Sequence, residues 1–398
     1  MSDYDIAIVG GGLVGMSLAL ALSPRWRVVL VESHGAPSSH PDKSSRGAWD
    51  ERCLALNDTS QRIFDRLGLW PELQTDAEAI HSTQISERGR FGVARFTAAE
   101  AGLEALGWNV PVRVIGTILW RHLAAAQVSV ICPAQVVDVQ THGAMSGLTL
   151  DSAGGAQQLA ARLVVAADGA DSTVRAKLGI GCEVRDYQQH AIVSAVRIAR
   201  GHAGVAYERF TSDGVLAVIP KAPRACSVIH TVADDQLEAW LALPDIDYLA
   251  RIQVLFGGRL GRFVELGRRV PHPLRRVLSR APTAARTVFI GNAAQNLHPV
   301  AAQGFNLGLR DAANLAAALA PAEDPGAAGC LAAYAAGRAE DREAASGFTD
   351  LLVRAFTSRA PGVVQLRHWG LVGAQLLPGV HQRMLHQHLG HRGLPPEL

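Results

Sequence analysis

The sequence predicts a mixed α/β (α+β) fold in which two domains are interleaved along the chain and followed by C-terminal helices. Three observations lead to this prediction. Residues 5–32 have the pattern of a strand, a glycine-rich turn, a helix and a second strand. Short apolar strands of the same kind return at residues 162–166 and 287–290. Between these two strands, residues 190–232 contain strand-like runs at short spacing, which is typical of an antiparallel sheet.

The composition of the 398-residue chain is that of a globular protein with a large core, because 48% of its residues are apolar. The 38 basic and 36 acidic residues nearly balance, so we expect no broad surface for nucleic-acid phosphates. The five cysteines are scattered and have no CxxC spacing. We therefore expect neither a disulfide framework nor a metal site, and a cytoplasmic location.

The N-terminal third begins with a βαβ unit. Its strands are predicted at residues 5–9 and 27–31, and its helix at residues 13–22. The uncharged stretch 6–24 is long enough to span a membrane, but its four glycines favour a strand, a tight turn and a buried helix. A loop follows at residues 35–50, and residues 52–69 are predicted to be helical, with Gly68 at the end.

The rest of the chain alternates between the two kinds of structure. After a mixed segment at 70–107, we expect a helix at 115–126, strands at 128–139, 148–151 and 162–166, a helix at 304–320, and helices from 332 onwards that break at Pro361 and Pro378. The predicted nucleotide-binding domain is therefore discontinuous. It comprises residues 1–69, 106–182 and 271–345, the substrate domain comprises 70–105 and 183–270, and a helical region comprises 346–398.

The sequence GGGLVG at residues 10–15 has the spacing of a dinucleotide-binding turn. Gly10 begins the turn, Gly12 lets the backbone approach a pyrophosphate, and Gly15 lets the helix pack closely on the sheet. Glu32 ends the second strand 22 residues after Gly10, where an acid can accept hydrogen bonds from a ribose. Strand, helix and acid together predict a Rossmann-like site for an adenine dinucleotide.

Two further motifs follow strands: VAADGADSTVR at residues 165–175, and GNAAQNLHP at 291–299 with AQGFNLGLRD at 302–311. Together the three motifs resemble those of the FAD-dependent aromatic hydroxylases, the class A flavoprotein monooxygenases with the para-hydroxybenzoate hydroxylase type of fold. The resemblance covers residues 4 to about 355. The segments at 51–70, 207–220 and 291–311 resemble the ubiquinone-biosynthesis hydroxylases within that family, and GNAAQ in particular resembles the 2-octaprenyl-6-methoxyphenol hydroxylase branch.

The resemblance implies roles for residues of this chain. The first motif would hold the ADP half of FAD, and the others would contact the rest of the cofactor. Asn292 stands where the broad family has Asp, and Ala302 stands where it usually has Gly. The cofactor-binding residues implied in the later motifs, together with an arginine that approaches the flavin, are Arg52, Asp168, Gly169, Gly291, Asn292, Gly304, Phe305 and Asn306.

The chemistry implied by the resemblance is hydroxylation of a phenol ring. NADPH or NADH would reduce the flavin, O₂ would form a C4a-hydroperoxide, and a polyprenylated phenol would receive the hydroxyl group. His298, Pro299 and Gln303 would lie nearest to this chemistry. The helix beginning at Gly304 would stabilise the reduced flavin, and the antiparallel sheet would exclude water. A complex of ubiquinone-biosynthesis proteins or a peripheral membrane contact is a further expectation.

Several features have simpler interpretations. His298 as a lone histidine could be structural, and we interpret Asp311 as a solvated or capping acid. The apolar stretch 369–382 is interpreted as ordinary core, with a surface for a lipid-borne substrate or a partner as the alternative. Four histidines near the C-terminus (His381, His386, His388 and His391) lack an accompanying carboxylate or cysteine set, which disfavours a metal site.

Alternative functions also remain open. The motifs typical of flavin halogenases and prenyl reductases, which share the fold, are absent from the sequence. A hydroxylase of another ring position, a hydroxylase of another phenolic substrate, and a flavin-bearing scaffold subunit of a biosynthetic complex are the alternatives to the predicted activity.

Overall fold

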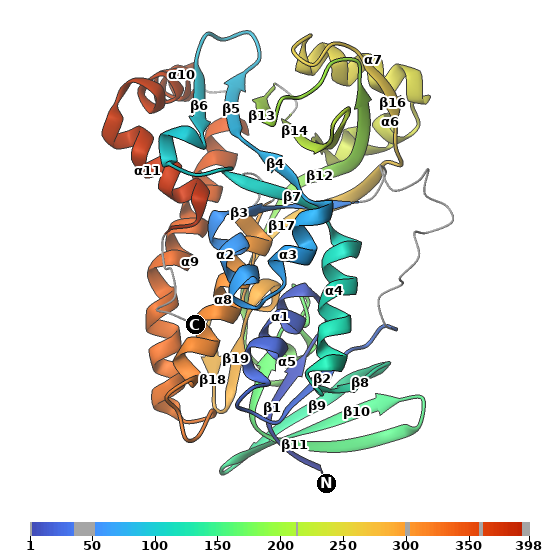
Figure 1. Cartoon of the computed structure of the whole chain (residues 1–398), viewed down its shortest axis with the longest axis vertical. Helices are drawn as coiled ribbons and strands as arrows, with labels where there is room; N and C mark the ends of the chain where they lie inside the picture. Colours follow the sequence, from blue (N-terminus) through green and yellow to red (C-terminus); the bar gives the residue numbers. More distant parts are fainter. Residues whose placement is uncertain (1, 36–51, 212–213, 299–302, 358–360, 392–398) are drawn as a thin grey trace.

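A computed structural model describes residues 2–35, 52–211, 214–298, 303–357 and 361–391. The molecule is elongated, and two large sheets lie at its opposite ends (Figure 1). One sheet, with the N-terminus, occupies the lower end, and the other lies in the upper part. The N-terminal, middle and late segments of the chain all contribute to the lower sheet. The predicted mixed α/β class with an interleaved topology is therefore confirmed, whereas the domain boundaries remain a prediction.

The lower sheet has a parallel centre. Its strand order is β18-β19-β11-β1-β2-β8, and β10 and β9 extend from β11 as antiparallel neighbours. The central pairs β11–β1, β1–β2, β2–β8 and β11–β19 are parallel. The strands are β1 (Ser2–Val9), β2 (Val28–Val31), β8 (Ser129–Ile131), β9 (Ala134–His142), β10 (Met145–Ser152), β11 (Gly155–Ala166), β18 (Thr283–Ala284) and β19 (Thr287–Phe289).

Both faces of the parallel centre are buried, which explains the apolar runs at the carboxyl ends of its strands, such as residues 6–9 and 163–166. Along β1, Ile6 and Ile8 face a core that also contains residues of α1 (Leu13–Leu22), α4 (Val112–Ala125) and α8 (Gln303–Leu319). Ala7 and Val9 face the other way, toward β9, β10 and the short helix α5 (Thr173–Lys177). The sequence-based predictions for α1, β2, α4 and α8 are confirmed to within three residues at each end.

The upper sheet is mostly antiparallel, as predicted from residues 190–232. Its order is β20-β17-β12-β15-β14-β13-β5-β6, with β16 paired to β12. The helices α6 (Leu237–Leu241) and α7 (Asp245–Phe256) cover one face and share its core. The strands are β5 (Ser82–Glu87), β6 (Val93–Thr97), β12 (Cys182–Ile198), β13 (Val205–Phe210), β14 (Val215–Ala222), β15 (Ala225–Ala233), β16 (Phe263–Leu266), β17 (Val270–Ser279) and β20 (Gln295–Asn296).

A small sheet, β3-β7-β4, lies between the two large ones, and it corrects one prediction (Figure 1). Residues 52–69 do not form one helix. Cys53–Asn57 is β3, which pairs with β7 (Gly107–Pro111), and α2 (Asp58–Arg66) begins only after Asn57, whose side-chain oxygen accepts a hydrogen bond from the Ser60 amide at 3.0 Å. A side chain that caps a helix marks its first turn, so the preceding residues were free to pair as a strand.

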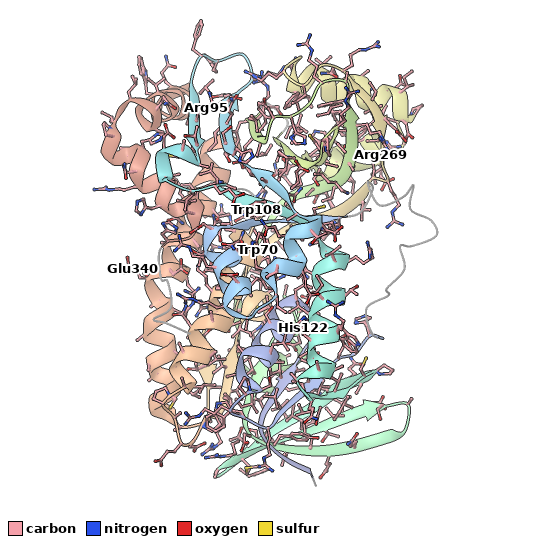
Figure 2. All side chains as sticks on the ribbon, in the orientation of Figure 1. Trp70, Arg95, Trp108, His122, Arg269 and Glu340 are labelled. Atoms are coloured by element: carbon pink, nitrogen blue, oxygen red, sulfur yellow. The ribbon has the colours of Figure 1, made fainter. Side chains whose placement is uncertain are left out.

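Two aromatic side chains fill the space beside the small sheet. Trp70 begins α3 (Trp70–Leu73), and Trp108 lies on β7, which also pairs with β4 (Glu78–Ile80). Figure 2 shows both indoles in the middle of the molecule, and their ring centroids are 5.3 Å apart in an edge-to-face arrangement. This contact is the geometry that aromatic pairs prefer, and it joins the middle segment to the nucleotide-binding side.

The C-terminal helices are α9 (Ala328–Thr357), α10 (Pro361–Leu376) and α11 (Pro378–Leu389), with breaks at the predicted prolines. They run up one side of the molecule, and α10 and α11 lie beside β5 and β6 (Figure 1). The interpretation of residues 369–382 as ordinary core is wrong. Ala374 is buried, but Trp369, Leu376 and Leu377 are 63%, 71% and 56% exposed. The helix α10 packs against β5, β6, α9 and α11, and these neighbours leave the three side chains exposed.

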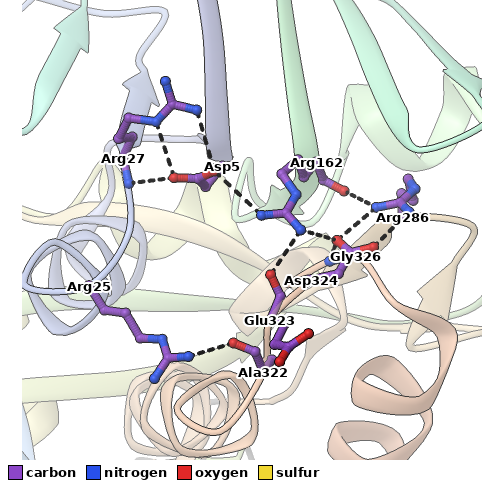
Figure 3. A network of polar contacts seen from close by, with 9 residues as sticks. All are labelled: Asp5, Arg25, Arg27, Arg162, Arg286, Ala322, Glu323, Asp324 and Gly326. Carbon is purple, nitrogen blue, oxygen red and sulfur yellow. Dashed lines mark hydrogen bonds and ion pairs between the residues drawn. The ribbon is translucent and has the colours of Figure 1, made fainter.

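A polar network at the lower end joins segments that are far apart in sequence (Figure 3). Asp5 on β1 forms ion pairs with Arg27 and Arg162. Arg286, before β19, donates to both carboxylate oxygens of Asp324 at 3.1 and 2.8 Å, and the Arg162 carbonyl accepts a third bond from it. The loop between α8 and α9 is thereby attached to β11. Because this network lies away from the carboxyl ends of the parallel strands, it stabilises the sheet without occupying the edge where ligands bind.

Candidate active site

The first glycine motif forms the turn between β1 and α1, and its glycines serve different purposes. Gly10 has φ +109°, and a Cβ there would collide with the Ala167 carbonyl. A Cβ on Gly15 would collide with the Gly10 carbonyl, so this glycine allows the close packing of helix on turn. A Cβ on Gly12 would meet nothing within 4 Å. The open space over Gly12, at the N-terminus of α1, is where a phosphate would fit.

Glu32 lies beside this turn, as predicted. Its Oε2 accepts a hydrogen bond from the Gly11 amide at 2.5 Å, and its Oε1 accepts one from the His34 amide at 2.7 Å. The carboxylate is thus held at the edge of the turn with a fixed orientation. Oε1 also lies within hydrogen-bonding distance of the Ser33 hydroxyl and the His34 ring, whereas Oε2 accepts only from Gly11 among the described residues. Oε2 therefore has a lone pair left for a ribose hydroxyl.

The second motif follows β11, next to the first. Gly169 has φ +90° and open space around it. The Oδ2 atom of Asp168 accepts from the Val174 amide at 3.1 Å. Its Oδ1 atom is buried and has no hydrogen-bond partner among the described residues. Burial raises the pKa of the Asp168 carboxyl, although hydrogen bonds from Ser172 and from backbone amides act to lower it. An unpartnered buried acceptor beside two glycine turns fits a hydroxyl-bearing ligand.

Arg175 is a structural residue of the site to which the sequence reasoning gave no role. Its buried guanidinium donates to the Ala170 carbonyl at 2.6 Å and to the Ala293 carbonyl at 2.8 Å. It therefore connects the second motif to the third. The signal in the sequence was its place inside the motif, two residues after Thr173.

The third motif begins with a short 3₁₀ turn, Gly291–Ala293, in which Gly291 has φ +57°. The side chain of Asn292 is exposed at this turn, where it is available to a ligand. The Gly291 amide donates to Asp311 Oδ2 at 3.0 Å, and Gln295 Nε2 donates to the same oxygen at 2.5 Å. Asp311 on α8 thus holds the whole turn in place.

The interpretation of Asp311 as a solvated or capping acid is wrong, because its side chain is fully buried. Its Oδ1 accepts from Arg338 Nε at 2.8 Å, and Arg338 also donates to Asp341 at 2.6 Å. Arg310 completes the group with a 2.8 Å bond from its Nε to Asp341. Burial acts to raise the pKa of Asp341, but the charges of Arg310 and Arg338 hold it below its ordinary value. Two acids and two arginines are thereby buried together with balanced charge.

The N-terminal turn of α8 carries three predicted cofactor residues. Gly304 has open space around it, and the ring of Phe305 stacks on Phe64. The Asn306 side chain is used within the protein, since its Oδ1 accepts from Ser60 Oγ at 2.6 Å and its Nδ2 donates to the Ala55 carbonyl at 2.9 Å. A cofactor contact at this position would therefore involve the backbone amide, which the first turn of a helix leaves available.

A cavity of about 90 Å³ lies between the upper sheet and the start of α8. Its walls are mainly apolar and come from β4, β14 and β15, including Ile80, Ile219 and Ile229. Its polar lining includes Asn57, Thr83, Glu208, His298, Gln303, Asn306 and His388. The sheet lies over the cavity as expected. Gln303, a predicted catalytic residue, is buried, and its Oε1 has no hydrogen-bond partner among the described residues.

His298 lines the cavity and is 2% exposed. Its ring lies edge-to-face with Tyr187, with ring centroids 5.2 Å apart. Burial lowers the pKa of His298 to about 4, so the imidazole is neutral at pH 7. A neutral imidazole donates one hydrogen bond and accepts another, but it supplies no positive charge.

The remaining predicted residues lie at the margin of this arrangement. Arg52 is exposed just before β3, and its carbonyl accepts a hydrogen bond from the Val112 amide at 2.9 Å. Its positive charge and burial of the imidazole both lower the pKa of His272 on β17, burial having the larger effect. Pro299 and Ala302 lie outside the described residues. His388, for which no role was predicted, belongs to the cavity lining.

Together these residues fit a dinucleotide that ends in a ring system. The two glycine turns, the N-terminus of α1 and Glu32 would hold a nucleotide, and Asp168 and Asn292 would meet a polar linker. From there the Gly291 turn leads to the N-terminus of α8 and the cavity, which would receive the ring system. Such a series of turns at the carboxyl ends of parallel strands is where α/β folds bind extended cofactors.

Comparisons with known proteins agree with this geometry. Residues 3–349 match the family described as FAD binding domain. The chain is 34% identical to a ubiquinone hydroxylase, UbiL, of Rhodospirillum rubrum, across 99% of this chain and 91% of that protein. It is 29% identical to 3-demethoxyubiquinol 3-hydroxylase of Escherichia coli, across 97% and 98%. The crystal structure of p-nitrophenol 4-monooxygenase PnpA of Pseudomonas putida has the same fold, with a TM-score of 0.79, 19% identity and complete coverage of both chains.

The fold and the site define an FAD-dependent flavoprotein of the class A monooxygenase type. Within this class, the chain belongs to the family of FAD-dependent hydroxylases that includes the ubiquinone hydroxylases. The resemblance stated from the three motifs is thereby confirmed, and so is the prediction of an oxidoreductase.

Proposed function

We propose that this protein hydroxylates the aromatic ring of a polyprenylated phenol in ubiquinone biosynthesis, specifically 2-polyprenyl-6-methoxyphenol. The main support for this proposal is the mainly apolar cavity between the upper sheet and the N-terminus of α8, at the end of the three glycine motifs. The names of relatives that align over nearly the whole chain support the pathway. An apolar cavity with few polar groups suits an aromatic ring that carries a hydrocarbon tail.

Bound FAD, reduced by a nicotinamide nucleotide, would supply the activation of O₂, and the C4a-hydroperoxide route remains a prediction. The protein has three tasks. The amides and the positive end of the dipole at the start of α8 would stabilise negative charge on the reduced ring system. The strands β14 and β15 would keep water out of the cavity. Neutral His298 and the amide of Gln303 would orient the ring by hydrogen bonds.

The co-substrate would be NADPH or NADH. No second GxGxxG motif that could bind it is present in the sequence. We therefore propose transient binding of the nicotinamide nucleotide at the surface, as the family resemblance implies. The choice between the two nucleotides would be read from the ratio of their kcat/KM values with the FAD-loaded protein.

The protein is also proposed to contact the membrane surface where its substrate resides. Among the described residues, no helix is both long and apolar enough to cross a bilayer. Exposed apolar side chains nevertheless gather where α10 and α11 lie beside β6: Phe91, Val93, Trp369, Leu376, Leu377 and Val380. Exposed Arg88 and Arg90 precede Phe91 in the sequence. Aromatic and apolar side chains next to arginines are typical of interfacial contact with anionic lipids. A complex with other ubiquinone-biosynthesis proteins would use the same surface.

The proposed activity is tested with the purified, FAD-loaded protein. Short-chain 2-prenyl-6-methoxyphenol, NADH or NADPH and ¹⁸O₂ should give a product that contains one ¹⁸O atom, detected by mass spectrometry. Deletion of the gene should cause a polyprenyl-6-methoxyphenol to accumulate. Oxidation of another ring position or another phenol would favour the alternative substrates. Binding of FAD without product formation from any phenol would favour the scaffold function.

A further inference from the structure

The cavity receives a polar group from the C-terminal helices, which the three motifs do not include. His388 on α11 and Thr83 on β5 both line it. The His388 Nε2 and Thr83 Oγ1 atoms are 3.3 Å apart, within hydrogen-bonding distance. The two residues are 305 positions apart in the sequence. They are therefore brought together only by the packing of α11 against the upper sheet.

Contacts at the end of α11 hold His388 in this position. Thr59 Oγ1 on α2 donates to the Leu389 carbonyl at 3.1 Å. His391 Nε2 lies 2.8 Å from Asp58 Oδ2, also on α2. Gly390 has φ +75°, and a Cβ there would collide with the side chain of Asn57, so the chain can approach α2 this closely only with glycine. The end of α11 is thus attached at three successive residues, which gives the imidazole little freedom.

The electrostatics of the pair suit a neutral hydroxyl group. Burial lowers the pKa of His388 to about 4, so its imidazole is uncharged at pH 7. A neutral imidazole and a threonine hydroxyl each have one donor and at least one acceptor. When Nε2 carries the proton, it donates to Thr83, whose hydroxyl can then both donate to a ligand and accept from it. Glu208 is the acidic residue of the lining, and none of the described lining residues is Lys or Arg, which disfavours a carboxylate ligand.

We propose that Thr83 and His388 bind the ring hydroxyl of an uncharged phenol, so that the C-terminal helix α11 determines which ring the cavity accepts. This inference rests on the proposed function and adds to it the groups that recognise the substrate. It also assigns α11 a role in substrate recognition, in addition to packing against β6.

The test compares two ligands in FAD-loaded protein without a nicotinamide nucleotide. The ligands are 2-geranyl-6-methoxyphenol and 3-geranylanisole, the same molecule without the ring hydroxyl. Dissociation constants are measured by isothermal titration calorimetry for the wild type and for His388→Leu and Thr83→Val. We expect the wild type to prefer the phenol by about 3- to 10-fold, the effect of one neutral hydrogen bond. This preference should disappear in both variants, with 3-geranylanisole bound as by the wild type.

A conservative variant and a control complete the design. His388→Gln, whose amide can occupy the place of the ring nitrogen, should restore part of the preference. His386→Leu, at an exposed position on the same helix, should leave it unchanged. Retention of the preference in Thr83→Val and His388→Leu would overturn the inference while leaving the proposed function intact, and so would an equal loss of affinity for both ligands. If the wild type binds neither ligand, the proposed substrate class and this inference both fail.

Discussion

At the scale of single residues, the glycines of the first motif separate packing from ligand binding. Gly10 and Gly15 lack a Cβ because the backbone of the neighbouring turn occupies its place, whereas nothing occupies the space beside Gly12. Gly12 also has φ −67°, which any residue can adopt. The fold therefore does not require glycine at this position, and the open space beside Gly12 is a property of the binding site.

This difference predicts that Gly12→Ala keeps the fold and loses the cofactor. The added methyl group would lie in the space for the pyrophosphate, and such overpacking costs about 1–3 kcal/mol. The dissociation constant for FAD should rise about 10- to 100-fold, as measured by quenching of flavin fluorescence. The melting temperature of the apoprotein should stay unchanged.

Gly337→Ala is the matched control, because a Cβ at this position on α9 also meets nothing within 4 Å and lies away from the motif. This substitution should change neither the dissociation constant for FAD nor the melting temperature of the apoprotein by much. Equal affinity of Gly12→Ala and the wild type for FAD would contradict the assigned site.

His298 predicts a pH dependence of stability. Its pKa is lowered to about 4 in the folded protein, against an ordinary value near 6.5. Between these values the unfolded chain binds a proton that the folded protein does not bind. His298 therefore does not reduce the free energy of unfolding above pH 6.5. As the pH falls toward 4, protonation of this residue in the unfolded chain lowers the free energy of unfolding by at most about 3 kcal/mol.

The measurement is the urea midpoint of the apoprotein between pH 7 and 4.5. The wild type should lose stability on acidification more steeply than His298→Gln, which removes the titrating group. His142→Gln, at an exposed position on β9, serves as the control. Parallel curves for the wild type and His298→Gln would show that burial of this histidine does not contribute to the pH dependence of stability.

At the scale of elements, α8 connects the cofactor turns to the C-terminal helices. Its first turn faces the cavity, its Gly308 approaches Gly291 and Val14, and Asp311 holds the Gly291 turn. One helix therefore positions the third motif, contacts the first and pairs with α9 through Arg338. The role predicted for its N-terminus therefore depends on Arg310 and Asp311, further along α8, and on Arg338 and Asp341 of α9.

We predict that Asp311→Asn is strongly destabilising. The substitution leaves Arg338 buried beside a neutral partner, and removal of one member of a buried ion pair costs about 3–5 kcal/mol. The urea midpoint should fall accordingly, and FAD affinity should weaken because the Gly291 turn loses its anchor. Asp65→Asn, at an exposed position on α2, should change stability by less than about 0.5 kcal/mol. A midpoint for Asp311→Asn equal to that of the control would refute the role assigned to this buried group.

At the scale of the whole molecule, the exposed apolar surface and the cavity lie on the same part of the protein. The helix α10 carries exposed Trp369 and Leu376, and exposed Leu377 joins it to α11, whose His388 lines the cavity. Figure 2 shows Arg95, on the strand β6 beside these helices, in this upper part of the molecule. A substrate with a long tail could therefore leave its tail at a membrane surface while its ring enters the cavity.

We predict that Phe91→Ser combined with Trp369→Gln weakens binding to anionic phospholipid vesicles. Burial of each aromatic ring contributes about 1.5–3 kcal/mol at most, so the partition coefficient should fall at least tenfold. Co-sedimentation measures it. Val137→Ser on β9, at the opposite end of the molecule, removes an exposed apolar side chain and should have no effect. An unchanged partition coefficient in the double variant would exclude this surface as the membrane contact.

The βαβ unit, the three cofactor motifs, the antiparallel sheet and the interleaved order could all be predicted from the sequence. These features depend on local patterns, because a glycine turn or a run of alternating apolar residues restricts the backbone within a few positions. The predictions that proved wrong have one cause in common. The segment 52–69, Asp311 and the stretch 369–382 were each interpreted from their own composition, without knowledge of their neighbours.

The surroundings of those residues depend on how distant segments pack. Cys53–Asn57 becomes a strand because β7 pairs with it, and Asp311 is buried because Arg338, 27 residues later, provides the opposite charge. Trp369, Leu376 and Leu377 are exposed because the neighbours of α10, which are β5, β6, α9 and α11, do not cover these side chains. His388 enters the cavity through contacts with residues more than 300 positions away. Burial and hydrogen-bond partners are set by packing between distant segments, and a local sequence pattern does not identify those segments.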